Sequence, residues 1–273
     1  MSEQAPRPRP GSGNKQDFPW WLAAVLLIGG YLGWRVVADD LYFNILSTLM
    51  RGVQLTVVVT LVSFFLASAL GLGLAMAAGS RWIVVRQTAR FYIEVVRGIP
   101  IIVLLLYVAF VLAPALVELR NWLGDHIGLD PIRTRNFPLL WRAIIALMIA
   151  YSAFISEVFR AGLQSVDPGQ IEAAKALGLS RWQRFRLVVF PQAIRTILPP
   201  LGNDFVALVK DSSLVSVLGV ADVTQLGKLT AVGNFRYFET YNVVALIYLT
   251  LTIGLSLALR RLEKHLRRRE ERR

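Results

Sequence analysis

The sequence predicts an all-α integral membrane protein. Its 273 residues are 55% apolar, and the apolar residues gather in several runs close to the ~20 residues that a helix needs to cross a bilayer. Backbone groups have no water partners in lipid, so runs of this length are expected to form helices. The chain contains no cysteine, which excludes a disulfide framework and thiolate chemistry.

Six transmembrane helices are predicted in chain order. The first begins with tryptophans suited to a membrane interface, and the second has room for an interfacial lead-in from Leu41. The fifth is expected to start at Pro199-Pro200, because proline restricts the residue before it and is tolerated in the first turn of a helix. The predicted spans are Trp20–Val37, Leu46–Gly79, Ile99–Val117, Leu139–Phe159, Ile197–Val220 and Tyr241–Leu259.

The distribution of positive charge predicts the orientation. Six spans place both termini on one side, and the segments on that side hold 21 of the 30 Lys and Arg residues. Because Lys and Arg collect on the cytoplasmic side, both termini are predicted to be cytoplasmic. The first apolar run lacks a small-residue cleavage pattern and is interpreted as a retained anchor. The segments counted are residues 1–19, 80–97, 160–196 and 260–273.

Small residues in the second span predict a close helix contact. Ala67, Gly71 and Ala75 recur every four residues and are joined by Gly73. On a helix they form a smooth stripe, which lets a neighbouring helix approach closely. This pattern indicates packing and says nothing about a substrate.

Ionisable side chains inside the predicted spans are candidates for function. A charge at a helix centre costs about 2.5–3.5 kcal/mol and usually faces a bundle interior or a wet cavity. Asp204 and Asp211 are seven residues apart and share a helical face, whereas Lys210 lies about 100° from Asp211. Two interpretations stay open, a buried ion-pair network and a polar translocation path. The group comprises Glu157, Asn203, Asp204, Lys210, Asp211, Ser212 and Ser213.

No pattern typical of catalysis or metal binding is found. The sequence lacks GxxxxGK[ST], the loop that cradles nucleotide phosphates. His126 and His265 have no clustered partners at metal-ligand spacing. Glu118, Asp125 and Asp130 are interpreted as solvated carboxylates of an outer loop.

The segment between the fourth and fifth spans predicts a helical hairpin outside the bilayer. Glu172–Leu177 is rich in strong helix formers, and Gly178 is a natural C-terminal stop. Ser180, with Gln183 in capping-box position, is expected to start a second short helix over residues 181–189. A docked partner would explain this hairpin, and an amphipathic hairpin lying on the membrane is the alternative.

These residues resemble the EAA motif of ABC importer permeases. Glu172-Ala173-Ala174 is followed by Gly178 and then by Pro191. The family usually ends the motif with Ile-x-Leu-Pro, where this chain has VVFP, a mild departure. The stretches RFYIEVVRGIPIIVLLL, YSAFISEVFRAGLQSV and PQAIRTILPPLGNDFVALVKDSSLVSVLGVADV are similar to polar amino-acid importers in particular.

The resemblance implies the transmembrane domain of a type I ABC transporter in the bacterial inner membrane. Glu172, Ala173, Ala174, Gly178 and Pro191 would couple the chain to a separate ATP-binding subunit, which would hold ATP and Mg. This chain would then be a transport subunit with no ATPase site and no cofactor of its own. Its other expected partners are a second permease, identical or homologous, an extracytoplasmic amino-acid-binding protein, and membrane lipid.

The resemblance covers about residues 45–260 and divides the chain. The basic tail is expected to be a solvated or headgroup-binding helix, and it lacks the interleaved aromatic residues of a nucleic-acid site. Two other functions remain, an ion-coupled transporter or channel and a non-transporting scaffold. The expected parts are a disordered cytoplasmic tail (1–18), an additional transmembrane helix with an outer loop (19–44), the permease domain (45–260) and the basic cytoplasmic tail (261–273).

Overall fold

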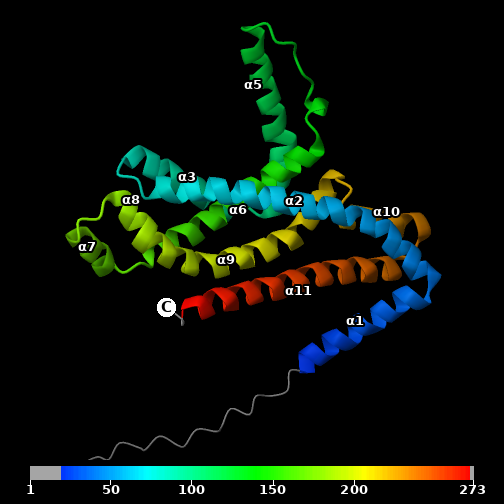
Figure 1. Cartoon of the computed structure of the whole chain (residues 1–273). Coiled ribbons are helices and arrows are strands. Elements are labelled where there is room, and N and C mark those ends of the chain that lie inside the picture. Colours follow the sequence, from blue (N-terminus) through cyan, green and yellow to red (C-terminus); the bar gives the residue numbers. More distant parts are fainter. Residues whose placement is uncertain (1–19, 271–273) are drawn as a thin grey trace, which may run out of the picture.

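The computed structural model describes residues 20–270, and every regular element in this part of the chain is helical. Figure 1 shows α2, α6, α9 and α11 running lengthwise through the molecule, with α5 projecting away from them. The helices are α1 (Trp20–Ala38), α2 (Asp40–Ala78), α3 (Ile83–Gly98), α4 (Ile101–Tyr107), α5 (Ala113–Asp125), α6 (Leu139–Gln164), α7 (Pro168–Ala176), α8 (Arg181–Arg184), α9 (Phe190–Asp211), α10 (Val223–Asn234) and α11 (Tyr237–Glu270).

Several helices are long and apolar enough to cross a membrane. Within the described residues, four stretches meet both conditions, and each overlaps a predicted span. The first predicted span corresponds to α1, whose apolar stretch Ala23–Ala38 is shorter. The four stretches are Asp40–Ala78, Ile101–Asp125, Leu139–Gln164 and Tyr237–Arg261.

The fifth predicted span differs from the structure at its start. Pro199 and Pro200 lie inside α9, so the prediction that they begin the helix is wrong. The helix persists because its two sides are packed: Ile197 contacts α6, and Gly202 faces Leu259 of α11. Tertiary packing therefore offsets the hydrogen bonds that the two prolines cannot donate.

The fifth span also differs at its end. The α-helix stops at Asp211, and Ser212–Leu218 forms a 3₁₀-helix that ends at Gly219, with φ +80°. The hydroxyl of Ser212 donates to the carbonyl of Val209 at 2.7 Å, and that of Ser216 donates to the carbonyl of Ser213 at 2.7 Å. Such bonds to nearby carbonyls compete with the regular helical ladder.

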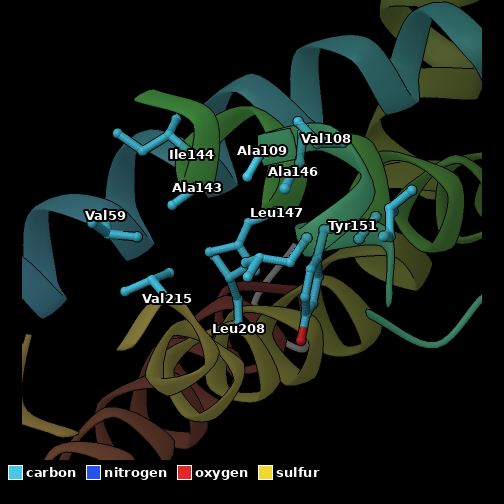
Figure 2. Packing of buried hydrophobic residues seen from close by; sticks show 14 of the residues in the cluster. Val59, Val108, Ala109, Ala143, Ile144, Ala146, Leu147, Tyr151, Leu208 and Val215 are labelled. Carbon is cyan, nitrogen blue, oxygen red and sulfur yellow. The ribbon is translucent and has the colours of Figure 1, made fainter. Parts of the chain in front are cut away.

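The central core lies where α2, α4, α6, α9 and the 3₁₀-helix meet. Leu147 and Leu208 are fully buried there, from α6 and α9, and Val59 approaches from α2. Figure 2 shows these side chains converging, with the hydroxyl of Tyr151 directed away from the apolar cluster. This apolar cluster thus joins helices that are far apart in the sequence.

The predicted small-residue stripe packs α2 against α6. Ala67 and Ala75 are buried, and a Cβ at Gly71 would lie 3.0 Å from the carbonyl oxygen of Ser152. Gly73 does not belong to this contact, because a Cβ there would meet nothing within 4 Å. The correction follows from helical geometry, since Gly73 is about 200° away from Gly71.

A buried arginine fixes the connection that precedes α6. Arg142 lies within the first turns of α6 and is buried. Its guanidinium donates to the carbonyls of Phe137 and Ala109, each at 3.0 Å, and to that of Thr134. Ala109 belongs to the π-helical segment Val108–Leu112 between α4 and α5. Arg142 therefore serves packing, because it ties the start of α6 to the segment between α4 and α5.

A second buried polar cluster ties α10 to α2 and α11. Asp222 caps α10 by accepting the Gln225 N–H at 2.8 Å, and it accepts the Tyr248 hydroxyl at 3.1 Å. Burial raises the pKa of Asp222, and these hydrogen bonds oppose the shift. A Cβ at Gly52 would lie 2.6 Å from the backbone nitrogen of Val223, so α2 touches this turn directly.

The two ends of the chain are only partly described. The tail predicted to be disordered, residues 1–18, lies outside the described residues. α11 continues as a helix to Glu270, through most of the predicted basic tail. In Figure 1 the end of α11 lies on the left with α7 and α8, whereas α10 lies on the right.

Candidate functional site

The candidate coupling segment begins with a capped helix. Asp167 precedes α7 and accepts the Gly169 N–H at 2.7 Å, and Pro168 occupies the first helical position. This position suits proline, whose missing N–H has no partner to lose there. Because Asp167 already caps the N-terminus, Glu172 is left free for another role.

Gly178 ends α7 in a Schellman motif. Its φ of +75° is left-handed, and its N–H donates to the carbonyl of Lys175 at 3.0 Å. The Leu179 N–H donates to the carbonyl of Ala174 at 3.2 Å. A Cβ at Gly178 would meet nothing within 4 Å, so the backbone angle, and not space, favours glycine.

The predicted capping box is confirmed at Ser180. Its hydroxyl accepts the Gln183 N–H at 3.3 Å, and its own N–H donates to the Gln183 amide oxygen at 2.9 Å. The second helix is not short, however, since α8 continues through a π-helical segment, Phe185–Val189, into α9. Pro191 explains the π-helical turn, because in a regular helix its ring would clash with the carbonyl four residues earlier.

α7 presents one face inward and another outward. Ala174 is 4% exposed and faces the rest of the molecule. Glu172 and Ala173 are exposed, and the Glu172 carboxylate has no hydrogen-bond partner among the described residues. Leu177 at the tip of the turn is 80% exposed. The sequence signal for Leu177 was present, an apolar residue beside a turn, but only the structure shows that it faces outward.

The hairpin is fixed to α6 and α9. The Gln192 amide donates to the Gln170 amide oxygen at 2.6 Å, which links α9 to α7. Ile171 of α7 packs on a cluster that includes Ala193 and Ile197 of α9. The inward face of α7 is therefore held by both polar and apolar contacts.

The contact between α6 and α9 beneath the hairpin is very close. A Cβ at Gly162 would lie 2.2 Å from Cγ1 of Ile197 and 3.2 Å from the carbonyl oxygen of Ala193. Only glycine lets the two backbones approach to this distance. Movement of α7 would consequently be passed to both α6 and α9.

Two half-buried carboxylates of α9, those of Asp204 and Asp211, lie near Tyr151 of α6. The Tyr151 hydroxyl donates to Oδ2 of Asp211 at 2.8 Å. Oδ2 of Asp204, two turns earlier on the same face of α9, is buried without a hydrogen-bond partner among the described residues. Tyr151 was missed in the sequence, although a hydroxyl inside an apolar span was its available signal.

The other predicted polar residues of α9 divide between its surface and its interior. Lys210 and Asn203 are exposed, Ser213 is half-buried and Ser212 is fully buried. Lys210 thus lies on a different side of the helix from Asp211, in agreement with the predicted angle of about 100°. Glu157 does not join this group, because it pairs with Arg160, with oxygen–nitrogen distances of 3.1 and 3.2 Å. Glu157 instead lines a separate cavity of about 530 Å³ between α2, α3 and α6.

Together these features define a multi-pass helical membrane protein with a rigid polar hairpin. Residues 69–271 match the family described as "Binding-protein-dependent transport system inner membrane component". The chain belongs to this family. It is accordingly the permease subunit of an ABC transporter in the bacterial inner membrane, and the ATPase activity resides on a separate subunit.

Amino-acid permeases are among its relatives. The chain is 37% identical over 221 residues to the "Glutamine transport system permease protein GlnP" of Escherichia coli K12. The aligned region covers 80% of this chain and 93% of the relative. It is 35% identical over 210 residues to the "Probable amino-acid permease protein YxeN" of Bacillus subtilis 168, covering 77% and 87% of the two chains.

Solved structures confirm the type I transmembrane fold. The "Crystal structure of an amino acid ABC transporter with histidines" matches with a TM-score of 0.67 and 34% identity, over 80% of this chain and 94% of that one. A bacterial alginate ABC transporter matches at 19% identity with a TM-score of 0.64, over 92% and 96% of the two chains, and supports the fold alone.

The close α6–α9 contact leads to a testable expectation. Gly162→Ala will loosen the hairpin, because the new methyl group displaces Ile197. Trypsin will then cut the folded protein faster at Lys175 and Arg181. The double variant Gly162→Ala/Ile197→Ala removes the clashing atom and is expected to slow this cleavage again. Equal cleavage of the wild-type and Gly162→Ala proteins would contradict the role given to this contact.

Proposed function

We propose that this chain is the membrane-spanning subunit of an ATP-driven importer for polar amino acids. A separate ATPase binds the α7 hairpin on the cytoplasmic side. An extracytoplasmic binding protein delivers the amino acid to the opposite face of the membrane. The amino-acid permeases among the relatives support this substrate class. The distribution of Lys and Arg supports the orientation.

The observation that carries the proposal is the construction of the hairpin. Its outward face, with Ala173 and Leu177, is exposed, while its inward face is fixed to two long helices. The turn that carries the exposed Leu177 is held by a Schellman motif on one side and a capping box on the other, so it presents a fixed surface to a partner. Glu172 adds an unpaired carboxylate to that surface.

The mechanism that follows is alternating access. Closure of the ATPase subunits displaces α7, and α6 and α9 move with it as packed rods, because their backbones touch at Gly162. Leu208 and Leu147 transmit that movement into the central core. As a consequence, the translocation path opens alternately to the two sides of the membrane.

A second permease subunit, identical or homologous, completes the pathway in this proposal. α5 projects from the bundle (Figure 1) and carries exposed apolar residues along its length. Such a helix has few contacts within its own chain, and a neighbouring subunit together with lipid would cover it. The exposed residues are Leu116, Leu119, Trp122 and Leu123.

The translocation path in this proposal follows the polar residues of α9. Asp204 and Asp211 supply carboxylates beside Tyr151, while Lys210 and Asn203 lie on another, exposed side of the helix. Ionisable groups at membrane depth usually line a cavity or pair with one another, and the unpaired Asp204 oxygen supports a path. Ser213, which is half-buried, extends this polar path beyond Asp211, whereas Ser212 lies fully buried beside it and donates to the carbonyl of Val209.

A variant at the turn tests the coupling role. Gly178→Asp places a bulky anion on the turn, whereas the fold should survive, because Asp is among the residues that tolerate left-handed geometry. We expect binding-protein-stimulated ATP hydrolysis and amino-acid uptake to be abolished at normal membrane abundance. Gly128→Asp is the matched control, since Gly128 also has positive φ (+71°) and open space but lies in another loop.

The outcomes separate the candidate functions. Normal coupling in Gly178→Asp would refute the role of the hairpin. Uptake by the purified chain alone in liposomes would favour an ion-coupled transporter. Unchanged uptake after deletion of the chain would favour a scaffold.

Variants on α9 test the path. Asp211→Ala removes the acceptor of the Tyr151 hydrogen bond, and Lys210→Ala removes an exposed cation. Each is expected to lower the initial uptake rate at least about tenfold relative to membrane abundance, Asp211→Ala because it removes a charged hydrogen bond and Lys210→Ala because it removes a charge of the proposed path. Lys228→Ala, an exposed cation of α10, is the control. Full uptake by both α9 variants would show that these residues have no role in the translocation path.

A further inference from the structure

Behind the hairpin lies a cavity of about 510 Å³ that the coupling role does not use. It is an open hollow bordered by three segments: the turn between α2 and α3, α7, and the run from α8 into the π-helical segment. Four cations line it, Arg81, Lys175, Arg181 and Arg184. No carboxylate is among the described residues that form its wall. The cavity therefore concentrates positive charge without an internal counter-ion.

The local structure explains why these cations converge. Arg181 and Arg184 are three residues apart and share a helical face. Lys175 lies one turn after Ile171 on α7, and both face the cavity. Nε of Arg184 is buried and has no hydrogen-bond partner among the described residues. A buried donor left unpaired calls for an acceptor, and an oxygen-rich anion supplies one.

The cavity faces away from Ala173, which belongs to the surface assigned to the ATPase. On α7, Ile171 and Lys175 line the cavity, whereas Ala173 lies about 200° from each of them around the helix. An acidic surface of the ATPase that rests on Ala173 is thus on the opposite side. The ligand of the cavity must come from another direction.

Aromatic and apolar side chains mark that direction as the membrane surface. Trp82 follows Arg81 and is 77% exposed, and Trp182 follows Arg181 and is 67% exposed. Ile83, at 62%, continues the apolar surface beside Trp82. Tryptophan is enriched at the level of lipid headgroups, so the two flanking rings indicate the depth at which the cations lie.

We propose that this cavity binds the phosphate group of an anionic phospholipid from the adjacent leaflet. The guanidinium groups of Arg181 and Arg184 match phosphate oxygens in bidentate geometry, while Lys175 and Arg81 add point charges. The apolar wall formed by Phe185 and Val189 accepts the glycerol and the first carbons of the chains. The site is independent of the transported substrate. The orientation proposed above decides only which of the two leaflets supplies the lipid.

The test measures lipid binding to the purified full-length chain. Native mass spectrometry, with phosphatidylglycerol or phosphatidylcholine added to the detergent-solubilised protein, reports the affinity for each lipid. The double variant Arg181→Gln/Arg184→Gln is expected to weaken phosphatidylglycerol binding at least about tenfold, since each cation near an anionic surface contributes about fivefold. Phosphatidylcholine binding should change little.

Two matched variants control for charge and fold. Arg133→Gln/Arg135→Gln removes two exposed cations from another loop and should bind phosphatidylglycerol as the wild type does. Arg181→Lys/Arg184→Lys keeps the charge and should restore part of the affinity. Equal losses in the Arg133/Arg135 variant would overturn the proposal by showing a general charge effect.

Three further results would overturn the proposal. The first is unchanged phosphatidylglycerol binding in Arg181→Gln/Arg184→Gln. The second is displacement of the lipid by soluble glycerol 3-phosphate at comparable concentration, which would assign the cavity to a free anion. The third is unchanged lipid binding together with lost ATPase binding in that variant, which would assign the cations to an acidic protein surface.

Discussion

The contact between α6 and α9 at Gly162 and Ile197 is the constraint on which the function of this protein depends. An exposed hairpin can transmit force only if its base does not yield. At Gly162 α6 has no side chain, so Ile197 and the carbonyl of Ala193 on α9 approach its backbone directly, and Ile171 packs α7 onto the same cluster. The hairpin, α6 and α9 thus behave as one body, which continues into the core through Leu147 and Leu208.

Irregular helix marks both ends of α9. A π-helical segment precedes Pro191, and a 3₁₀-helix follows Asp211. Each departs from the α-helical ladder for a local reason, a proline ring in the first case and serine hydroxyls in the second. The packed middle of α9 lies between these two segments. The carboxylates beside Tyr151 lie in the packed part.

Short-range rules predicted the hairpin well, and long-range contacts decided the rest. The ends of α7 and the start of α8 follow from Gly178, Ser180 and Gln183, whose effects act within a few residues. The prediction that Pro199 and Pro200 start a helix was wrong, because packing on α6 and α11 keeps the helix continuous through them. The pairing of Glu157 with Arg160 was equally hidden, since spacing permitted several partners. Burial of Tyr151 beside Asp211 depends on the approach of α6 to α9, which no local pattern encodes.

The most direct measurement is photocrosslinking from the outward face of α7 in the assembled transporter. The chain has no native cysteine, so Ala173→Cys provides a unique thiol for a benzophenone label. Covalent attachment of an ATP-binding subunit to this position is predicted, with none from Leu229→Cys on exposed α10. Labelling of Ala173→Cys by an impermeant reagent from outside the cell, or crosslinking that never includes an ATPase, would contradict the account.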